Sequence, residues 1–267
     1  MYDYHYDLLT YILMNKDNLR EVKKHCSNIF KGGIDGGIFN LFYMSPEEMK
    51  EELSIKYEEI DIVKNLETVK KSIQKEQLIP ENINYIIGIE GLDYLKKIED
   101  IDVLYELGVR EIAPVWNNHN KFGTGVRPGK IINKQKGLTP QGKELVHKLI
   151  EIGIIIDVSH SDEETFWDII KECKKHKNQI PKIIASHSNC KAIYNVQRNL
   201  DDKQIKAIAE FNRNNRGCNN KTIFIKAKPR KSIHRKHKTH ITNNPNPKNT
   251  SYCHRWYVIL QNKFKLL

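Results

Sequence analysis

Two histidines in this chain each follow a short apolar run. Residues 154–156 lead through Asp157 to His160, and residues 183–185 lead through Ser186 to His187. Such runs are typical of buried strands, and a lone histidine at a strand end is more often structural than a ligand. Two histidines in matching positions, at the strand ends where α/β enzymes place their chemistry, instead indicate a metal site.

Two further segments add carboxylates and a third imidazole. His5 and Asp7 lie two residues apart, a spacing that on a strand places both side chains on the same face. Glu90 ends the apolar run 85–89, and its carboxylate could bridge two cations. The five side chains predict a two-metal centre with positions open to water, and they are His5, Asp7, Glu90, His160 and His187.

Alternating strand and helix patterns must position these residues. Apolar runs predict six strands before residue 211, at residues 2–6, 37–44, 84–90, 109–116, 154–156 and 183–185. An amphipathic helical stretch is expected over residues 46–75, and Thr139 and Pro140 predict an N-cap and first turn of another helix. Asp201 and Asp202 begin a further helix. The alternation predicts an α/β fold with parallel strands.

Seven short motifs occur in one order along residues 2–210, and they are HYD, GIEG, VWNN, LTPQGKELV, IDVSH, ASHSN and RNLDD. In this order they resemble the membrane dipeptidase (renal dipeptidase) family of zinc metallopeptidases. The resemblance implies a TIM-like (β/α)8 barrel and a hydrolase that cleaves dipeptides with a hydroxide shared by two zinc ions. Only six strand-helix units are recognisable here, so the barrel is expected to be incomplete, with the last two units missing or replaced.

The same resemblance assigns roles to the ligands. His5 and Asp7 would hold one zinc ion, His160 and His187 the other, and Glu90 would bridge the two. Zinc is implied by the family, since this ligand set would also accept manganese or cobalt.

Three residues are expected to meet the substrate. Arg198, in the RNL motif, matches the arginine that receives the substrate carboxylate, although a helix cap or a surface salt bridge is its alternative role. Trp116 stands where the renal enzymes carry a histidine that polarises the scissile carbonyl. Bacterial-type relatives resemble this chain in having the Trp-Asn pair, which here is Trp116 and Asn117. The nearby His119 is expected to be a solvated loop residue.

The basic charge belongs to one part of the chain. The formal net charge is +11, but of the 44 Lys and Arg residues 14 lie from Phe211 onward, where there is no Asp or Glu. The first 210 residues therefore carry 30 basic and 33 acidic residues, as an ordinary enzyme does. This division predicts a partial dipeptidase barrel over residues 1–210 and a basic, Asn-rich tail over residues 211–267.

Three interpretations of the tail remain open. It could be a basic arm for an anionic partner, a divergent closure of the barrel, or an out-of-frame translation of an A/T-rich gene. Loss of motifs and of acidic residues at one point favours the third, which an uninterrupted frame in several isolates would exclude. The family places a proton-handling aspartate in this region, and its absence predicts about 10²- to 10⁴-fold lower turnover.

The cellular setting is expected to be the cytoplasm. The five cysteines form no CxxC pair and are odd in number, which fits a reducing compartment, and no leader or membrane-spanning run is evident. The expected partner is a dipeptide, without a membrane; a homodimer is compatible, and nucleic acid is expected only through the tail. The alternative functions are a noncatalytic remnant whose tail binds nucleic acid or another anion, and a different amidohydrolase activity on the same metals.

Overall fold

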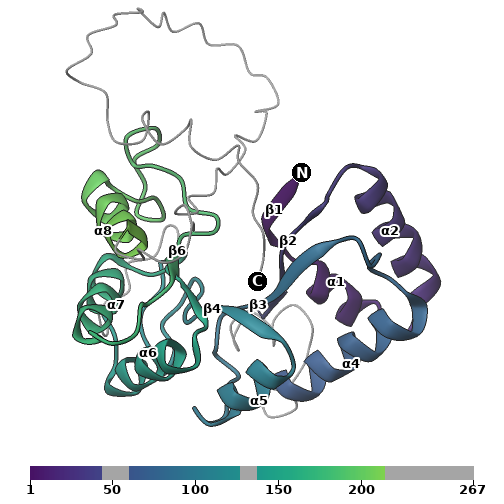
Figure 1. The fold of residues 1–267 in the computed structure, drawn as a ribbon, viewed down its shortest axis with the longest axis horizontal. Coiled ribbons are helices and arrows are strands. Elements are labelled where there is room, and N and C mark those ends of the chain that lie inside the picture. The colour runs from purple at the N-terminus through teal and green to yellow at the C-terminus, as the bar shows by residue number, and fades with distance from the viewer. Residues whose placement is uncertain (44–59, 127–136, 214–267) are drawn as a thin grey trace, which may run out of the picture.

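The computed structural model describes residues 1–43, 60–126 and 137–213. Within them, six parallel strands form one curled sheet, a half-barrel in which the strand order follows the chain (Figure 1). The strands are β1 (Tyr2–Tyr6), β2 (Gly36–Phe42), β3 (Asn84–Glu90), β4 (Val109–Ala113), β5 (Ile155–Asp157) and β6 (Ile183–Ile184). The predicted α/β fold with six strands is confirmed, as a partial TIM-like barrel.

Helices connect successive strands and lie on the outside of the curl (Figure 1). In the described ranges they are α1 (Leu8–Met14), α2 (Leu19–Lys31), α4 (Ile62–Glu76), α5 (Asp100–Glu106), α6 (Pro140–Ile152), α7 (Glu163–Lys175) and α8 (Asp202–Arg213). The helix expected over residues 46–75 is observed from Ile62 onward, and its proposed start at Ser45 and Pro46 lies outside the described residues.

The apolar runs form strands because both faces of the sheet are covered. In β2 the side chains of Phe39 and Leu41 are fully buried, as Ile89 is in β3. Strands of a parallel sheet covered on both sides are expected to be continuously apolar. The helices add amphipathic faces, such as Leu66 and Val69 of α4, which pack into the same core.

Local capping sets the helix boundaries. The Thr139 side chain accepts a hydrogen bond from the Gly142 N–H at 2.9 Å, and Pro140 occupies the first turn of α6, as the sequence predicts. The helix ends at Gly153, whose φ of 81° lies in the left-handed region that favours glycine. This end leads directly into β5 and so determines where the IDVSH segment enters the sheet.

One strand is shorter than expected. The fourth strand was predicted to extend to Trp116, but β4 ends at Ala113. Pro114 follows, and proline has no N–H to donate to a neighbouring strand. Trp116 and Asn117 therefore lie in the loop beyond the strand, on the side of the sheet where the other strands end.

Among the described residues, no helix is both long and apolar enough to cross a bilayer.

Replacing Gly142 by alanine should destabilise the fold. A Cβ there would lie 1.8 Å from the Phe122 carbonyl oxygen, a backbone atom that cannot rotate away. We expect a loss of about 1–3 kcal/mol in the free energy of unfolding, despite the better helix propensity of alanine. Urea unfolding of Gly142→Ala measures this, and Lys143→Ala at the adjacent exposed position is the control. Equal stability of the two variants would contradict the close packing.

Candidate metal centre

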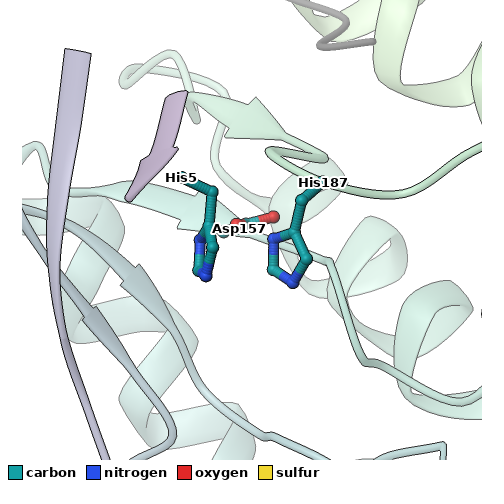
Figure 2. A group of neighbouring side chains, drawn as sticks. All are labelled: His5, Asp157 and His187. Atoms are coloured by element: carbon teal, nitrogen blue, oxygen red, sulfur yellow. The ribbon is translucent and has the colours of Figure 1, made fainter. Parts of the chain in front are cut away.

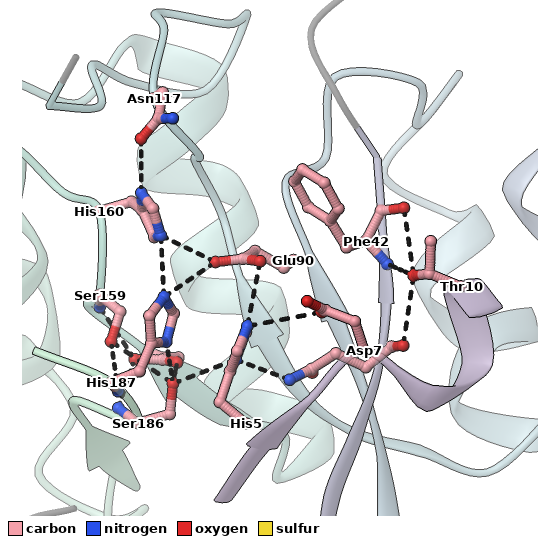
Figure 3. A network of polar contacts seen from close by, with 12 residues as sticks. His5, Asp7, Thr10, Phe42, Glu90, Asn117, Ser159, His160, Ser186 and His187 are labelled. Atoms are coloured by element: carbon pink, nitrogen blue, oxygen red, sulfur yellow. Dashed lines mark hydrogen bonds and ion pairs between the residues drawn. The ribbon is translucent and has the colours of Figure 1, made fainter. Parts of the chain in front are cut away.

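The predicted ligands meet at the carboxyl end of the sheet (Figure 3). Glu90, the last residue of β3, lies between three imidazoles. Its Oε1 is 2.9 Å from His160 Nε2 and 3.1 Å from His187 Nε2, and its Oε2 is 3.2 Å from His5 Nε2. Residues separated by more than 180 positions in the sequence thus converge on one buried carboxylate.

Asp7 joins this group by a different route from the one that the sequence suggests. The alternation of strand side chains was expected to align it with His5, but β1 ends at Tyr6 and Asp7 is the N-cap position of α1. The turn into the helix, rather than the pleat of a strand, brings Asp7 Oδ1 to 3.6 Å from His5 Nε2. The two side chains approach each other, but the strand-based reason for this was wrong.

Three overlapping groups have ligand atoms that lie within 4.8 Å of one another. They are His5, Asp7 and Glu90; Glu90, His160 and His187; and His5, Asp157 and His187. The first two are the two halves of the predicted centre, and they share Glu90. Imidazole nitrogens and carboxylate oxygens in such numbers suit zinc and other divalent first-row metals.

Hydrogen bonds on the far side of two rings fix where their protons lie. Asn117 Oδ1 lies 2.8 Å from His160 Nδ1, and with the amide in this orientation it accepts the Nδ1 proton. Ser186 Oγ donates to Asp157 and must therefore accept from His187 Nδ1 at 2.7 Å. In both rings the Nε2 atom is consequently left with a bare lone pair, the state in which histidine binds a metal.

This proton arrangement fits a bound cation. The two Nε2 atoms of His160 and His187 face each other at 2.8 Å, and both face Glu90 Oε1. Within the described ranges, Glu90 Oε1 is buried and has no contact with hydrogen-bond geometry. Three electron-rich atoms that converge without a proton between them repel one another, and a divalent ion among them would remove the repulsion.

Burial and neighbouring charge keep the centre ready for a metal. Burial lowers the pKa of His160 to about 4, and it also lowers the pKa of His187, so both rings are neutral near pH 7. Burial alone would raise the pKa of Glu90, and the imidazoles lower it well below its usual range only in so far as their Nε2 atoms carry protons. At His5 the same carboxylate reverses the effect of burial, and the pKa is raised.

Asp157 has a structural role that the sequence alone did not indicate. Its carboxylate is 1% exposed and accepts hydrogen bonds from the Ser159 N–H at 2.8 Å and the Ser186 N–H at 3.1 Å, in addition to the Ser186 hydroxyl. Figure 2 shows it behind the stacked rings of His5 and His187, whose centroids are 3.7 Å apart. It ties the loop after β5 to the loop after β6. An aspartate ending an apolar run was the available signal.

His160 is held in an unusual backbone conformation. Its φ is 69°, in the left-handed region that residues other than glycine rarely adopt. Such conformations persist where surrounding contacts enforce them, and they occur often at functional sites. Here the contact of His160 with Asn117 and the hydrogen bond from Val126 N–H to the His160 carbonyl at 2.7 Å hold the residue in place.

The predicted substrate residues border the centre, with different neighbours. Trp116 packs against Phe42 and lies 6.0 Å from His160 between ring centroids. Asn117 is engaged with His160 through its oxygen. Arg198 donates to Ser188 Oγ at 2.8 Å, while His119 is exposed, as expected of a solvated loop residue.

In the metal-free protein, His160 should make the fold less stable in acid. Its folded pKa of about 4 lies below the ordinary value of 6.5, so the unfolded chain binds a proton first as the pH falls. This costs up to ~1.4 kcal/mol per pH unit between those two values. Urea unfolding with a chelator, from about pH 7 to about pH 5, should show a shallower loss for His160→Gln than for the wild type. Parallel curves would contradict the assigned burial of this imidazole.

Known proteins similar in sequence to this chain include members of one peptidase family. The sequence model of the membrane dipeptidase family (Peptidase family M19) matches residues 1–234. The chain is 36% identical over 129 residues to an uncharacterized protein of Acinetobacter calcoaceticus, in a match covering 47% of this chain and 39% of that protein. It is 30% identical over 137 residues to an uncharacterized dipeptidase of Schizosaccharomyces pombe, covering 51% of this chain and 32% of the relative. The chain spans less than half the length of these relatives.

Solved structures share the fold. A crystal structure of a metallopeptidase from Rhodobacter sphaeroides, bound to a phosphinate mimic of the dipeptide L-Ala-D-Ala, superimposes with a TM-score of 0.58 and 22% identity. The match covers 78% of this chain and 70% of that one. The structure of dipeptidase AC gives 0.59 and 22%, covering 79% and 69%. Because the family match covers most of its residues, the chain belongs to the membrane dipeptidase family of metallopeptidases.

Proposed function

We propose that this chain is a metal-dependent dipeptidase that holds two divalent ions, expected to be zinc, with His5, Asp7, Glu90, His160 and His187. The observation that carries the proposal is the convergence of three imidazole Nε2 atoms on the two oxygens of Glu90. When bound, the ions would polarise a peptide carbonyl and lower the pKa of a water molecule toward neutrality.

The chain's own residues would prepare that site for chemistry. Glu90 directs one oxygen to each half of the centre, so its negative charge would help to hold both ions. Asn117 and Ser186 keep the protons of His160 and His187 on the side away from the centre. The lowered pKa values of both rings mean that protons do not compete with a metal near pH 7.

Arg198 would bind the carboxylate at the C-terminal end of the substrate. Burial lowers its pKa to about 10, so the guanidinium remains charged at neutral pH. In the part of the chain that the structure describes, no carboxylate lies at ion-pair distance from it, although Glu90 and Asp157 act on it electrostatically. A partly buried guanidinium without a carboxylate partner can pair with a ligand carboxylate in bidentate fashion. Such anchoring beside the metals would restrict substrates to very short peptides.

The Trp116 ring would form one wall of the substrate site. It lies in the loop after β4, between the Phe42 ring and the ligand His160. Asn117, expected to contact substrate, uses its Oδ1 to orient His160, which leaves its amide nitrogen as the group that could face a substrate carbonyl. The position of Asn117 therefore supports a role both in orienting His160 and in contacting the substrate.

The division of the chain at residue 210 remains a prediction. The family match continues to residue 234, beyond the last of the seven motifs, while residues 214–267 lie outside the described part of the structure. Residues 211–267 contain no Asp or Glu, so no side chain in this stretch can take the proton-handling role, and the lowered turnover remains a prediction.

A dipeptide assay on the purified full-length chain tests the proposed activity. Metal-free protein should gain hydrolysis when zinc, manganese or cobalt is added, and Glu90→Gln should lower both metal content and rate by at least about 100-fold. Glu81→Gln, at an exposed position outside the centre, is the matched control. Metal binding without hydrolysis of any dipeptide would favour the noncatalytic alternative, and hydrolysis only of other amides would favour a different amidohydrolase activity.

A separate substitution tests the carboxylate anchor. Arg198→Lys keeps the charge but removes the bidentate geometry, so KM for dipeptides should rise about 10- to 100-fold with a smaller change in kcat. Arg110→Lys is the control, because the Arg110 guanidinium stacks on Tyr105, away from the centre. An unchanged KM, or equal sensitivity to dipeptide amides that lack the carboxylate, would reject this role.

A further inference from the structure

A row of inward-facing positions crosses the sheet at one level. Asn40 of β2 pairs in register with Gly88 of β3, which in turn pairs with Glu111 of β4. Both polar side chains are 1% exposed, and Asn40 stands in an otherwise apolar strand. Buried polar groups must find partners inside the protein, so this row requires an account of its hydrogen bonds.

The missing side chain of Gly88 makes room for these two groups. A Cβ at Gly88 would lie 2.0 Å from Asn40 Oδ1 and 2.2 Å from Glu111 Oε2, far inside any allowed contact. The two side-chain ends therefore occupy the same small space. Within the described ranges, both of these oxygens are buried and without a hydrogen-bond partner.

Each end of this row reaches one half of the metal centre. On one side, Asn40 Nδ2 lies 2.7 Å from Nδ1 of His5. On the other, the Glu111 carboxyl is hydrogen-bonded to Asp157, whose partner Ser186 contacts His187 Nδ1. The row thus lies behind the ligands and connects the His5 side with the His187 side.

The orientation of the Asn40 amide group determines which nitrogen of His5 can bind a metal. If Nδ2 donates to His5 Nδ1, the neutral ring must carry its proton on Nε2. That atom faces Glu90 and Asp7 and would then have no lone pair for a cation. Amide oxygen and nitrogen have nearly the same shape, so the reversed sense fits the same space.

Counting donors favours the reversed amide. With Oδ1 toward Glu111, the carboxyl would need one proton for Asn40 and another for the Asp157 carboxylate, but a carboxylic acid has a single O–H. Complete burial and the nearby Asp157 charge raise the pKa of Glu111 well above its usual range, which supplies that one proton. It can be donated to Asp157 only if Asn40 offers Glu111 a donor instead of an acceptor.

We propose that Asn40 is a positioning residue whose Oδ1 accepts a hydrogen bond from His5 Nδ1–H while its Nδ2 donates to Glu111 Oε2. This arrangement satisfies both orphaned oxygens and leaves His5 Nε2 free as a ligand. The inference rests on the proposed metal function for its purpose, but not on which substrate is cleaved. Each of the three imidazoles then has an orienting partner at Nδ1, Asn40 for His5, Asn117 for His160 and Ser186 for His187. Ser186 Oγ also lies 3.5 Å from His5 Nδ1, a longer contact than that of Asn40 at 2.7 Å.

The tautomer of His5 tests the proposal directly. Two-bond 1H–15N spectra of the full-length, metal-free chain labelled with 15N-histidine, at alkaline pH, distinguish Nδ1–H from Nε2–H rings. The His5 signal is identified by its loss in His5→Gln. We expect the Nδ1–H tautomer, and an Nε2–H tautomer would overturn the inference.

Variants of Asn40 provide a second measurement. Asn40→Ala should shift His5 toward a mixture of tautomers and weaken zinc binding to the chain about 10- to 100-fold. Asn40→Asp keeps an acceptor for His5 Nδ1–H and should retain the wild-type tautomer. Asn84→Ala, at an exposed position of β3, is the control for substitution in the sheet. If Asn40→Ala folds with unchanged tautomer and zinc affinity, the proposal is wrong; if it does not fold, the wild-type spectrum still decides.

These results separate the inference from the proposed activity. Tautomer and zinc affinity are read without any substrate, so an inactive chain with the Nδ1–H tautomer supports the role of Asn40 and rejects only the peptidase activity. An active chain with the Nε2–H tautomer supports the peptidase activity and rejects the role of Asn40.

Discussion

The structure depends on the burial of one ionised carboxylate. Glu90 is 3% exposed at the end of a central strand, and a negative charge in such a place is costly unless cations or donors surround it. The chain meets this demand with three imidazoles from distant segments. Two of them, His160 and His187, are neutral and direct lone pairs toward the same oxygen, so the proposed metal would complete the surroundings of the carboxylate. The arrangement of the three imidazoles and the proposed chemistry follow from this constraint.

The parallel sheet makes the convergence possible. Strand ends of one direction gather at one rim, and the residues just after them form the centre, whereas the polar groups within the strands lie beneath it. Asp157 joins two of the rim loops, and Asn40 and Glu111 extend the polar contacts across the sheet to His5. The ligands therefore rest on a layer of buried hydrogen bonds, which is the usual requirement for holding metal ligands in one orientation.

The described residues form six of the eight strands that a complete (β/α)8 barrel would have. In the described chain, β1 and β6 are the outer strands and each pairs with a single neighbour. All five proposed ligands nevertheless lie within the six strand-helix units that are present. The proposed metal centre therefore needs only these six units, because its ligands come from β1, β3, β5 and β6 and the segments that follow them.

The sequence by itself determined the α/β fold, and it indicated the proposed ligands and the strand ends at which they lie. These features are local: apolar runs, caps such as Thr139 and histidines at strand ends can be read from neighbouring residues. It also suggested a wrong reason for the approach of Asp7 to His5 and a strand that ran past Pro114. Only the tertiary structure showed that Asn40, Glu111 and Asp157 lie together behind the proposed ligands. Their meaning depends on register between strands and on the space left by Gly88, and such non-local contacts leave no periodic pattern in a single sequence.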